Sequence, residues 1–283
     1  MASKQTILIT GATGQQGGAV LRHLKGAGFS LRALTRKPDS DKARALAGQG
    51  VDVVKGDLDD EASLRTALAG AWGVFAVQNT WEAGVEGEER QGKRLATLAK
   101  AAGVQHYVST SVGSAHRRTG IPHFENKWRI EDTIRTQQFP SHVIIRPVFF
   151  MENLIGPWFL NGDTLSAAMK PTTDLQMIAT DDIGRVGARA FINAAAFKGR
   201  EIDIAGDTAT MPRVVEVLSR AMGRPIQFQQ IPIEAVRKNS EDFATMLEWF
   251  ERVGYNADIP ALDKEFGRMT RLDEWAGRAA KGA

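Results

Sequence analysis

The sequence predicts an α/β protein with a doubly wound parallel sheet, followed by a smaller, mixed α/β domain. Two observations carry this prediction. Up to about residue 150, short apolar runs rich in β-forming residues alternate with helical patterns, which is typical of βαβ units. After Pro147 the alternation stops, and residues 148–175 are rich in Phe, Trp, Met, Gly and Pro without a steady period. We therefore place the two domains at 1–150 and 151–283, and we expect some C-terminal segments to return to the first sheet.

The first domain is predicted element by element. Each strand is a short apolar run, and each helix that follows has apolar residues at helical spacing. The expected strands are 6–10, 30–35, 51–56, 73–79, 106–111 and 141–147. The expected helices are 15–25, 42–47, 61–68, 88–102 and 125–135.

The second domain begins with the irregular stretch 148–175, whose length and aromatic content are more typical of a pocket wall or a lid than of a connector. Thr210 and Pro212 suit the N-cap and the first turn of a helix. We expect helices at 183–196 and 212–222, strands at 201–206 and 226–232, and further helices after them.

The composition is that of an ordinary globular protein. Of 283 residues, 43% are hydrophobic and 24% are charged, and the net charge is +3 without a basic block. We therefore expect neither a nucleic acid nor a membrane as a direct partner. Cysteine is absent, which excludes disulfides and thiolate metal sites, and we expect no metal. The first ten residues do not have the pattern of a signal peptide, so we expect a cytoplasmic protein.

Three glycines stand between the first strand and the first helix, in the stretch ITGATGQQGGAV: Gly11, Gly14 and Gly17. The first permits a tight turn, the second lets a pyrophosphate approach the backbone, and the third lets helix and strand pack closely. Backbone N–H groups and the positive end of the helix then face the phosphates. A glycine-rich turn without a ligand is the alternative. The position between a strand and a helix favours a dinucleotide site in a Rossmann sheet.

The end of the second strand indicates which dinucleotide binds. An NAD site has an acidic residue there to hold the ribose 2′-hydroxyl. This chain has LTRKP instead, so that Arg36 and Lys37 stand where a 2′-phosphate would lie. Two solvated surface cations are the alternative. We expect NADP(H), with NADPH preferred over NADH.

The third strand ends in KGDLDD. Asp57 and Leu58 suit the adenine, which they could hold and cover. A helix N-cap by Asp57 or Asp59 fits these residues equally well.

The sequence resembles the NmrA-like branch of the atypical short-chain dehydrogenases/reductases. The resemblance covers nearly the whole chain and rests on ITGATGQQGGAV, LTRKP, VVKGDLDD, FAVQNTWE, YVSTSVGSA, HFENKWRIE, IIRPVFFMENL and TDDIG, and on the C-terminal stretches EIDIAGDTATMPRVVEVLSRAMGRPIQFQQIP and MLEWFERVGYNADIPAL.

The resemblance implies an NADP(H)-binding Rossmann domain at 1–150 and a smaller substrate or partner domain at 151–283. It implies that the pyrophosphate loop is formed by Gly11, Thr13, Gly14, Gln15 and Gly17, and that the 2′-phosphate is held by Arg36 and Lys37. It also implies that Asp57 and Leu58 contact the adenine, and that the approach to the ribose and nicotinamide is lined by Val77, Gln78, Asn79 and Lys127. The nicotinamide itself would be flanked by Pro147, Val148 and Phe149.

The usual catalytic pair of short-chain reductases is Tyr-x-x-x-Lys, in which the tyrosine protonates the new alkoxide. The chain has two tyrosines, and neither is followed by lysine at this spacing. HFENK instead places His123 four residues before Lys127, on the same side of a helix. His123 could replace the tyrosine as an acid. We favour slightly the alternative that it caps the helix or lines the cleft.

Two further groups are candidates for the substrate site. Thr110 and Ser111 close the fifth strand, where a hydroxyl can polarise a carbonyl, and the sequence does not choose between them. An apolar pocket is one interpretation of the large side chains after the fourth and sixth strands, and interior packing is the other: Trp81, Phe149, Phe150, Met151, Trp158 and Phe159. Among them, Glu152 and Asn153 suit a helix cap or a position facing the cleft.

Two functions fit these residues. We favour an NADPH-dependent oxidoreductase that acts on a small apolar carbonyl, quinone or enone, with Lys127, His123, Thr110 and Ser111 as candidate catalytic residues. The alternative is a non-catalytic NADP(H) redox sensor that regulates transcription or signalling through a protein partner. Homo-oligomerisation is open in either case.

Overall fold

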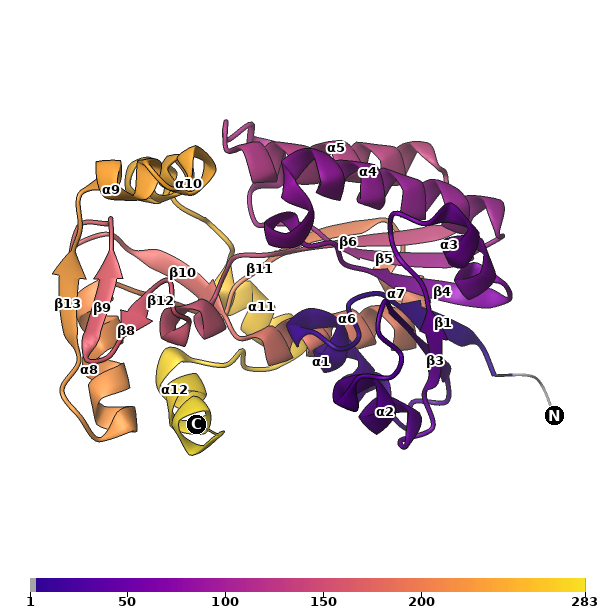
Figure 1. The fold of residues 1–283 in the computed structure, drawn as a ribbon, viewed down its shortest axis with the longest axis horizontal. Coiled ribbons are helices and arrows are strands. Elements are labelled where there is room, and N and C mark those ends of the chain that lie inside the picture. The colour runs from indigo at the N-terminus through magenta and orange to yellow at the C-terminus, as the bar shows by residue number, and fades with distance from the viewer. Residues whose placement is uncertain (1–3, 283) are drawn as a thin grey trace. The chain divides into compact units, whose positions relative to one another are not determined.

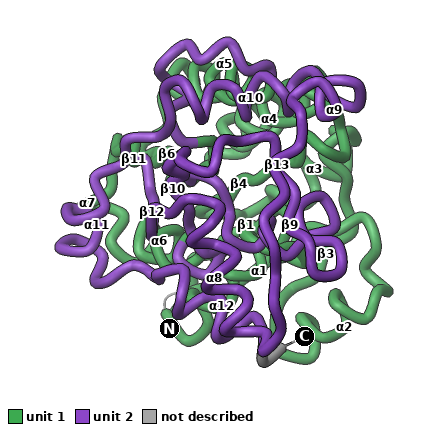
Figure 2. Tube along the Cα trace, turned by 90° about the vertical axis from the view of Figure 1, so that its left-hand side faces the viewer, with its two compact units in different colours: residues 1–112, 123–146, 183–202 green, residues 113–122, 147–182, 203–283 purple. Residues whose placement is uncertain are grey.

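The computed structural model describes residues 4–282, which form two compact units (Figure 2). Unit 1 comprises the chain up to Val112 together with residues 123–146 and 183–202. Unit 2 comprises residues 113–122, 147–182 and 203–283. That the first domain binds the cofactor and the second binds the substrate or a partner stays a prediction.

A seven-stranded sheet forms the centre of unit 1, with strand order β11-β6-β5-β4-β1-β2-β3. The ladders from β3 to β6 are parallel, which confirms the doubly wound fold. The strands are β1 (Thr6–Ile9), β2 (Ser30–Thr35), β3 (Asp52–Lys55), β4 (Ala71–Ala76), β5 (His106–Thr110), β6 (Ser141–Pro147) and β11 (Arg200–Ile204).

Helices cover both faces of this sheet (Figure 1). On one face lie α3 (Glu61–Leu68), α4 (Thr80–Ala101) and α5 (Pro122–Thr136). On the other lie α1 (Gln15–Leu24) and α6 (Thr180–Ile192), where a Cβ on Gly184 would stand 2.4 Å from the Ala19 Cβ. Unit 1 also contains α2 (Asp41–Ala47) and α7 (Ala194–Phe197). The helix predicted at 183–196 is therefore two helices.

Helix α4 begins eight residues before the predicted start at Glu88. Its first turn is separated from the rest by Gly84, whose φ of 72° lies outside the helical region. Asn79 is the N-cap, and its side-chain oxygen accepts a hydrogen bond from the Trp81 N–H at 3.1 Å. The turn Thr80–Ala83 is thus a short piece joined to the main helix by a glycine.

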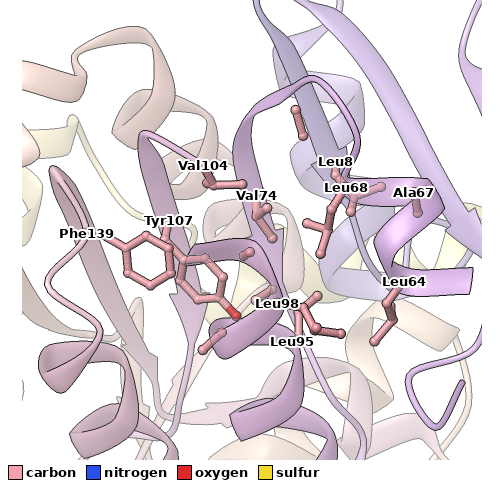
Figure 3. Close-up of a cluster of buried hydrophobic side chains, with 14 of the residues drawn as sticks. Leu8, Leu64, Ala67, Leu68, Val74, Leu95, Leu98, Val104, Tyr107 and Phe139 are labelled. Atoms are coloured by element: carbon pink, nitrogen blue, oxygen red, sulfur yellow. The ribbon is translucent and has the colours of Figure 1, made fainter. Parts of the chain in front are cut away.

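The core between the sheet and the helices α3, α4 and α5 is a cluster of buried apolar side chains (Figure 3). Leu64 and Leu68 come from α3, and Leu95 and Leu98 come from α4. Tyr107 of β5 points into this cluster, and its ring stacks on Phe139 with the ring centroids 4.7 Å apart.

Unit 2 contains two small sheets. One has the order β12-β10-β7 and the other β13-β9-β8, and each combines a parallel and an antiparallel pair. The stretch 148–175, predicted without regular structure, contributes three of these short strands. The strands are β7 (Phe149–Phe150), β8 (Leu160–Asn161), β9 (Thr164–Ala167), β10 (Leu175–Ile178), β12 (Asp207–Ala209) and β13 (Gln227–Gln230).

The helices of unit 2 follow mainly at the C-terminal end. The predicted cap of α8 is confirmed, because the Thr210 side chain accepts from the Arg213 N–H and Pro212 lies in the first turn. None of the helices in residues 4–282 is long and apolar enough to cross a membrane. The helices are α8 (Met211–Met222), α9 (Ile233–Arg237), α10 (Glu241–Arg252), α11 (Ile259–Phe266) and α12 (Leu272–Gly282), with 3-10 turns at Ala115–Arg117 and Met151–Ile155.

Candidate functional site

The glycine loop joins β1 to α1 in the predicted position. Gly11 has a φ of 60°, and the Gly14 N–H donates to the Gly11 carbonyl at 2.9 Å. A Cβ on Gly17 would stand 2.4 Å from the Gly11 oxygen and 2.5 Å from the Thr10 oxygen. Helix α1 has no side-chain cap and no acidic residue in its first turn. Its first N–H groups can therefore receive an anion. Thr13 and Gln15 flank Gly14 in this loop.

Strands β1 and β4 are linked at their carboxyl ends by Thr10. Its hydroxyl accepts from the Val77 N–H at 2.8 Å and donates to the Val77 carbonyl at 2.9 Å. The predictions did not single out Thr10. Gln78 follows, and within residues 4–282 neither polar atom of its buried amide has a hydrogen-bond partner. Because an unpaired buried amide costs free energy, Gln78 is a candidate ligand contact.

Arg36 and Lys37 follow β2 and are both exposed. The Arg36 guanidinium forms an ion pair with Glu82 in the first turn of α4, with Nη2 and Oε2 2.6 Å apart. The Lys37 ammonium forms no ion pair with any residue from 4 to 282. Strand β1 lies between β2 and β4, so the Arg36–Glu82 pair joins the two loops on either side of the glycine loop.

In the acidic stretch after β3, the N-cap of the next helix is a different residue from those considered in the sequence analysis. Asp60 is the N-cap of α3, and the predicted N-cap at Asp57 or Asp59 is therefore wrong. The Asp57 carboxylate accepts from the Asp59 N–H at 2.9 Å, which forms a local turn. Leu58 packs partly buried against the core cluster. The adenine role of Asp57 and Leu58 stays a prediction.

Lys127 lies on α5 and pairs with a buried carboxylate on α4 that the predictions missed. Its ammonium is 2.7 Å from Glu88 Oε1, and the Glu88 side chain is only 1% exposed. Thr80 and Asn126 also donate to Glu88. Burial alone would raise the pKa of Glu88. The charge of Lys127 and these hydrogen bonds outweigh burial and hold the pKa below its ordinary value.

A signal for Glu88 is present in the sequence. Glu88, Gly92, Leu95 and Ala99 have the spacing of one helix face, and all four are buried. A carboxylate on an otherwise apolar face requires a buried partner, which here is Lys127.

His123 and Lys127 lie on one helix, as their spacing predicts, and both are buried. The His123 ring is 5.4 Å from the Trp81 ring and 4.8 Å from the Phe124 ring. Its role as an acid stays a prediction.

Thr110 and Ser111 differ in their hydrogen bonding. The Thr110 hydroxyl faces the Ala76 carbonyl at 3.5 Å, the long limit of a hydrogen bond. The Ser111 hydroxyl is buried and has no partner among residues 4–282. Ser111 follows the end of β5 and Gln78 lies two residues after the end of β4, so both come just after the carboxyl ends of neighbouring strands. Ser111 is therefore the hydroxyl available to a ligand.

The two tyrosines differ in their surroundings. Tyr107 is buried in the core cluster of unit 1, whereas Tyr255 of unit 2 is partly buried and contacts the rings of Trp249 and Phe250. Burial raises the pKa of both phenols, and the charge of Asp203 raises that of Tyr255 further. Both phenols therefore stay protonated near neutral pH.

The remaining predicted contacts, Pro147, Val148 and Phe149, belong to unit 2. The Val148 N–H donates to the Ile204 carbonyl at 3.2 Å, and Pro147 accepts from the Gly113 N–H at 2.8 Å. The Phe149 ring contacts Phe159 and Phe250, and Met151 is fully buried, which agrees with interior packing for these side chains. Trp81 and Trp158 are instead exposed, by 64% and 83%.

Glu152 accepts hydrogen bonds from the Thr180 N–H at 3.1 Å and from the Trp275 indole at 3.2 Å. Glu152 was predicted to cap a helix or to face the cleft. Its carboxylate accepts from the first N–H group of α6, which agrees with the capping role. Asn153 is exposed. Burial raises the pKa of Glu152 despite these hydrogen bonds.

The glycine loop, the Thr10 link and the doubly wound sheet describe a nucleotide-binding scaffold, and comparison with known proteins identifies which one. The model of the NmrA-like family matches residues 3–276. The chain belongs to the NmrA-like family.

Two relatives of this NmrA-like protein align over almost the whole chain. It is 31% identical to the (4-alkanoyl-5-oxo-2,5-dihydrofuran-3-yl)methyl phosphate reductase of Streptomyces griseus, over 97% of this chain and 98% of that protein. It is 25% identical to the NADPH-dependent quinone oxidoreductase of Escherichia coli solved with NADPH, with a TM-score of 0.80 over 96% of this chain and 99% of the other.

A third relative supports the fold alone. The structure of NmrA, a negative transcriptional regulator, in complex with NADP is 22% identical to this NmrA-like chain. Its TM-score is 0.81, and the match covers 98% of this chain and 96% of that one.

Proposed function

We propose that this NmrA-like protein is an NADPH-dependent oxidoreductase that reduces a small apolar carbonyl, quinone or enone. The observation that carries the proposal is the loop from Gly11 to Gly17, whose backbone leaves no room for a Cβ at Gly17 and whose helix lacks a cap of its own. A pyrophosphate fits such a loop because it supplies the acceptors that the helix N-terminus lacks. The names of the Streptomyces and Escherichia relatives support reduction with NADPH.

The choice of NADPH rests on the end of β2. Arg36 offers a planar fork for phosphate and Lys37 a point charge, and the strand ends without the acidic residue that an NAD site uses. We assign Asp57 and Leu58 to the adenine, and Val77, Gln78 and Asn79 to the approach towards the ribose and nicotinamide. Asn79 performs this role in addition to capping α4.

We assign the nicotinamide ribose to Lys127 and the polarisation of the substrate oxygen to Ser111. Bound NADPH supplies the hydride. Ser111 donates a hydrogen bond to the oxygen on which negative charge develops. His123, one turn from Lys127 on α5, is the candidate proton donor for a carbonyl, whereas a quinone can take its proton from water. Pro147, Val148 and Phe149 are proposed to flank the nicotinamide.

The test mixes the NADPH-loaded protein with a panel of quinones and enones in a stopped-flow instrument. We expect oxidation of NADPH above background with at least one acceptor, and a loss of about ten- to a hundredfold in rate for Ser111→Ala. Thr110→Ser, which keeps a hydroxyl at the neighbouring position, is the matched control and is expected to keep the rate. No oxidation with any acceptor would contradict the enzyme.

A second function is favoured by one observation. Tyr107 is buried in the core cluster of unit 1, and neither tyrosine is followed by lysine at the Tyr-x-x-x-Lys spacing, so the usual proton donor of the short-chain reductases has no counterpart among them. This suits a redox sensor that binds NADP(H) and reports its state to a protein partner. Such a sensor must bind NADP+ and NADPH with different affinities in at least one conformation. Calorimetric titration with both forms decides this, and equal affinities with and without a partner exclude the sensor.

A further inference from the structure

The Arg36–Glu82 ion pair joins the loops that follow two strands on either side of the glycine loop. Arg36 follows β2, Glu82 follows β4, and β1 with its glycine loop lies between these strands. The carboxyl ends of β1 and β4 are the switch point of the sheet, where doubly wound folds bind nucleotides. The pair therefore lies beside the switch point, at the strand end where the predicted 2′-phosphate would lie.

We propose that Glu82 is a latch that competes with the 2′-phosphate for Arg36 and thereby tunes the preference for NADPH over NADH. This inference rests on the proposed NADP(H) function. The 2′-phosphate carries more negative charge than a carboxylate and can accept both arms of the guanidinium fork. Its binding replaces Glu82 at Arg36, and the released carboxylate returns to water. NADH has no group at this position that can replace it.

The exposure of the two side chains makes this exchange feasible. The Arg36 side chain is 61% exposed and that of Glu82 is 56% exposed. An ion pair so exposed to water contributes little free energy, so the latch lowers NADPH affinity without abolishing binding. Neither charge becomes buried and unpaired when the pair opens.

Only the exposed Glu82 side chain has to rotate for the pair to open, because Thr80 in the same turn is hydrogen bonded to the buried Glu88. Gly84, with a φ of 72°, separates the turn Thr80–Ala83 from the buried part of α4, which begins at Gly87. Glycine adopts this conformation at low cost. Trp81 in the same turn contacts His123 of α5.

The test measures dissociation constants of the full-length protein for NADPH, NADH and 2′,5′-ADP by calorimetry. We expect E82Q to tighten NADPH and 2′,5′-ADP about two- to fivefold and to leave NADH unchanged. The matched control is E86Q, which removes an exposed carboxylate one turn further along α4 and is expected to change nothing. The gain from E82Q is expected to vanish in an R36A background, because the competition requires Arg36.

The outcomes separate the latch from the proposed function. A wild-type protein that does not prefer NADPH over NADH overturns both. A clear wild-type preference with E82Q equal to E86Q overturns the latch alone. Weaker NADPH binding by E82Q also overturns it, because Glu82 would then be a ligand of the cofactor rather than a competitor.

Discussion

At the scale of single residues, the loop after β1 depends on the absence of a side chain at one position. Gly17 brings α1 against the carbonyls of Thr10 and Gly11, and this contact fixes the direction in which the first N–H groups of the helix point. Gly18, its neighbour, has more room, because a Cβ there would stand 3.2 Å from the Ala12 oxygen. The two glycines are therefore not equivalent.

We expect Gly17→Ala to weaken NADPH binding by at least about tenfold and to lower the free energy of unfolding by roughly 1–3 kcal/mol, because backbone atoms of the loop must move. Gly18→Ala is the control, and its effect is expected to stay within about 1 kcal/mol. Fluorescence titration and denaturant unfolding measure the two quantities. Wild-type binding by Gly17→Ala would refute the assignment of this loop to the pyrophosphate.

At the scale of elements, α4 and α5 are joined by a buried charge pair and a close contact. Glu88 holds Lys127, and a Cβ on Gly92 would stand 2.6 Å from Ile130 Cδ1. The close packing fixes the distance between the helices, and the ion pair fixes the position of the Lys127 ammonium. Glu88 thus positions the group that we assign to the ribose.

Glu88→Gln is expected to lower the free energy of unfolding by roughly 3–5 kcal/mol, because it leaves the buried Lys127 ammonium without its counter-charge. Adding Lys127→Met should restore part of this loss. Glu89→Gln is the matched control, since Glu89 pairs with Lys93 and Arg129 nearer the surface, and it should cost less than about 1 kcal/mol. Urea unfolding of the four proteins at neutral pH measures these changes; equal losses for Glu88→Gln and Glu89→Gln would contradict the buried pair.

Most helices and strands could be predicted from the sequence, and the exceptions have physical reasons. Strands β1 to β5 were predictable because each is an apolar run followed by a helical pattern, whereas β11 was predicted as a strand of the second domain. The start of α4 was missed because Gly84 and Gly87 interrupt the helical pattern there. The N-cap of α3, Asp60, was missed because several neighbouring acidic residues suit an N-cap, and only the local backbone geometry selects one of them.

The candidate site was predictable where it follows a strand end and less so where it depends on distant contacts. Arg36 was found from its position after β2, but its partner Glu82 lies 46 residues away and no periodicity links the two. Thr10 is a single hydroxyl at a strand end, without a pattern around it. Glu88 could have been found, because it interrupts an apolar helix face.

At the scale of the whole molecule, stability is expected to depend on pH through a buried histidine. His106 in β5 is hydrogen bonded to Ser141 and to the Ala190 carbonyl, and burial lowers its pKa to about 4, although the second bond acts in the opposite direction. Below about pH 6.5, the unfolded chain therefore binds a proton at His106 that the folded state does not bind. The stabilising effect is complete above that pH and is lost as the pH falls towards 4.

Between pH 6.5 and 4.5, we expect the free energy of unfolding to fall by roughly 2–3 kcal/mol, measured by urea titration at several pH values. The carboxylates with lowered pKa, such as Glu88, lose their contribution only at lower pH. His106→Gln should flatten the slope in this range. His142→Gln is the control, because burial lowers the pKa of that half-buried histidine less strongly. An unchanged slope in His106→Gln would show that another group titrates.

One face of the sheet in unit 1 is covered by a helix that is synthesised long after the strands it covers. Helix α6 packs on α1 and on Phe75 of β4, yet it lies more than a hundred residues after both. A ribosome adds roughly 5–20 residues per second, so the face of the nascent sheet next to α1 stays open to water for several seconds after its strands have formed. We expect ribosome-bound chains that end before Thr180 to be cut readily by proteases and to bind chaperones, and chains that extend past Ile204 to resist both.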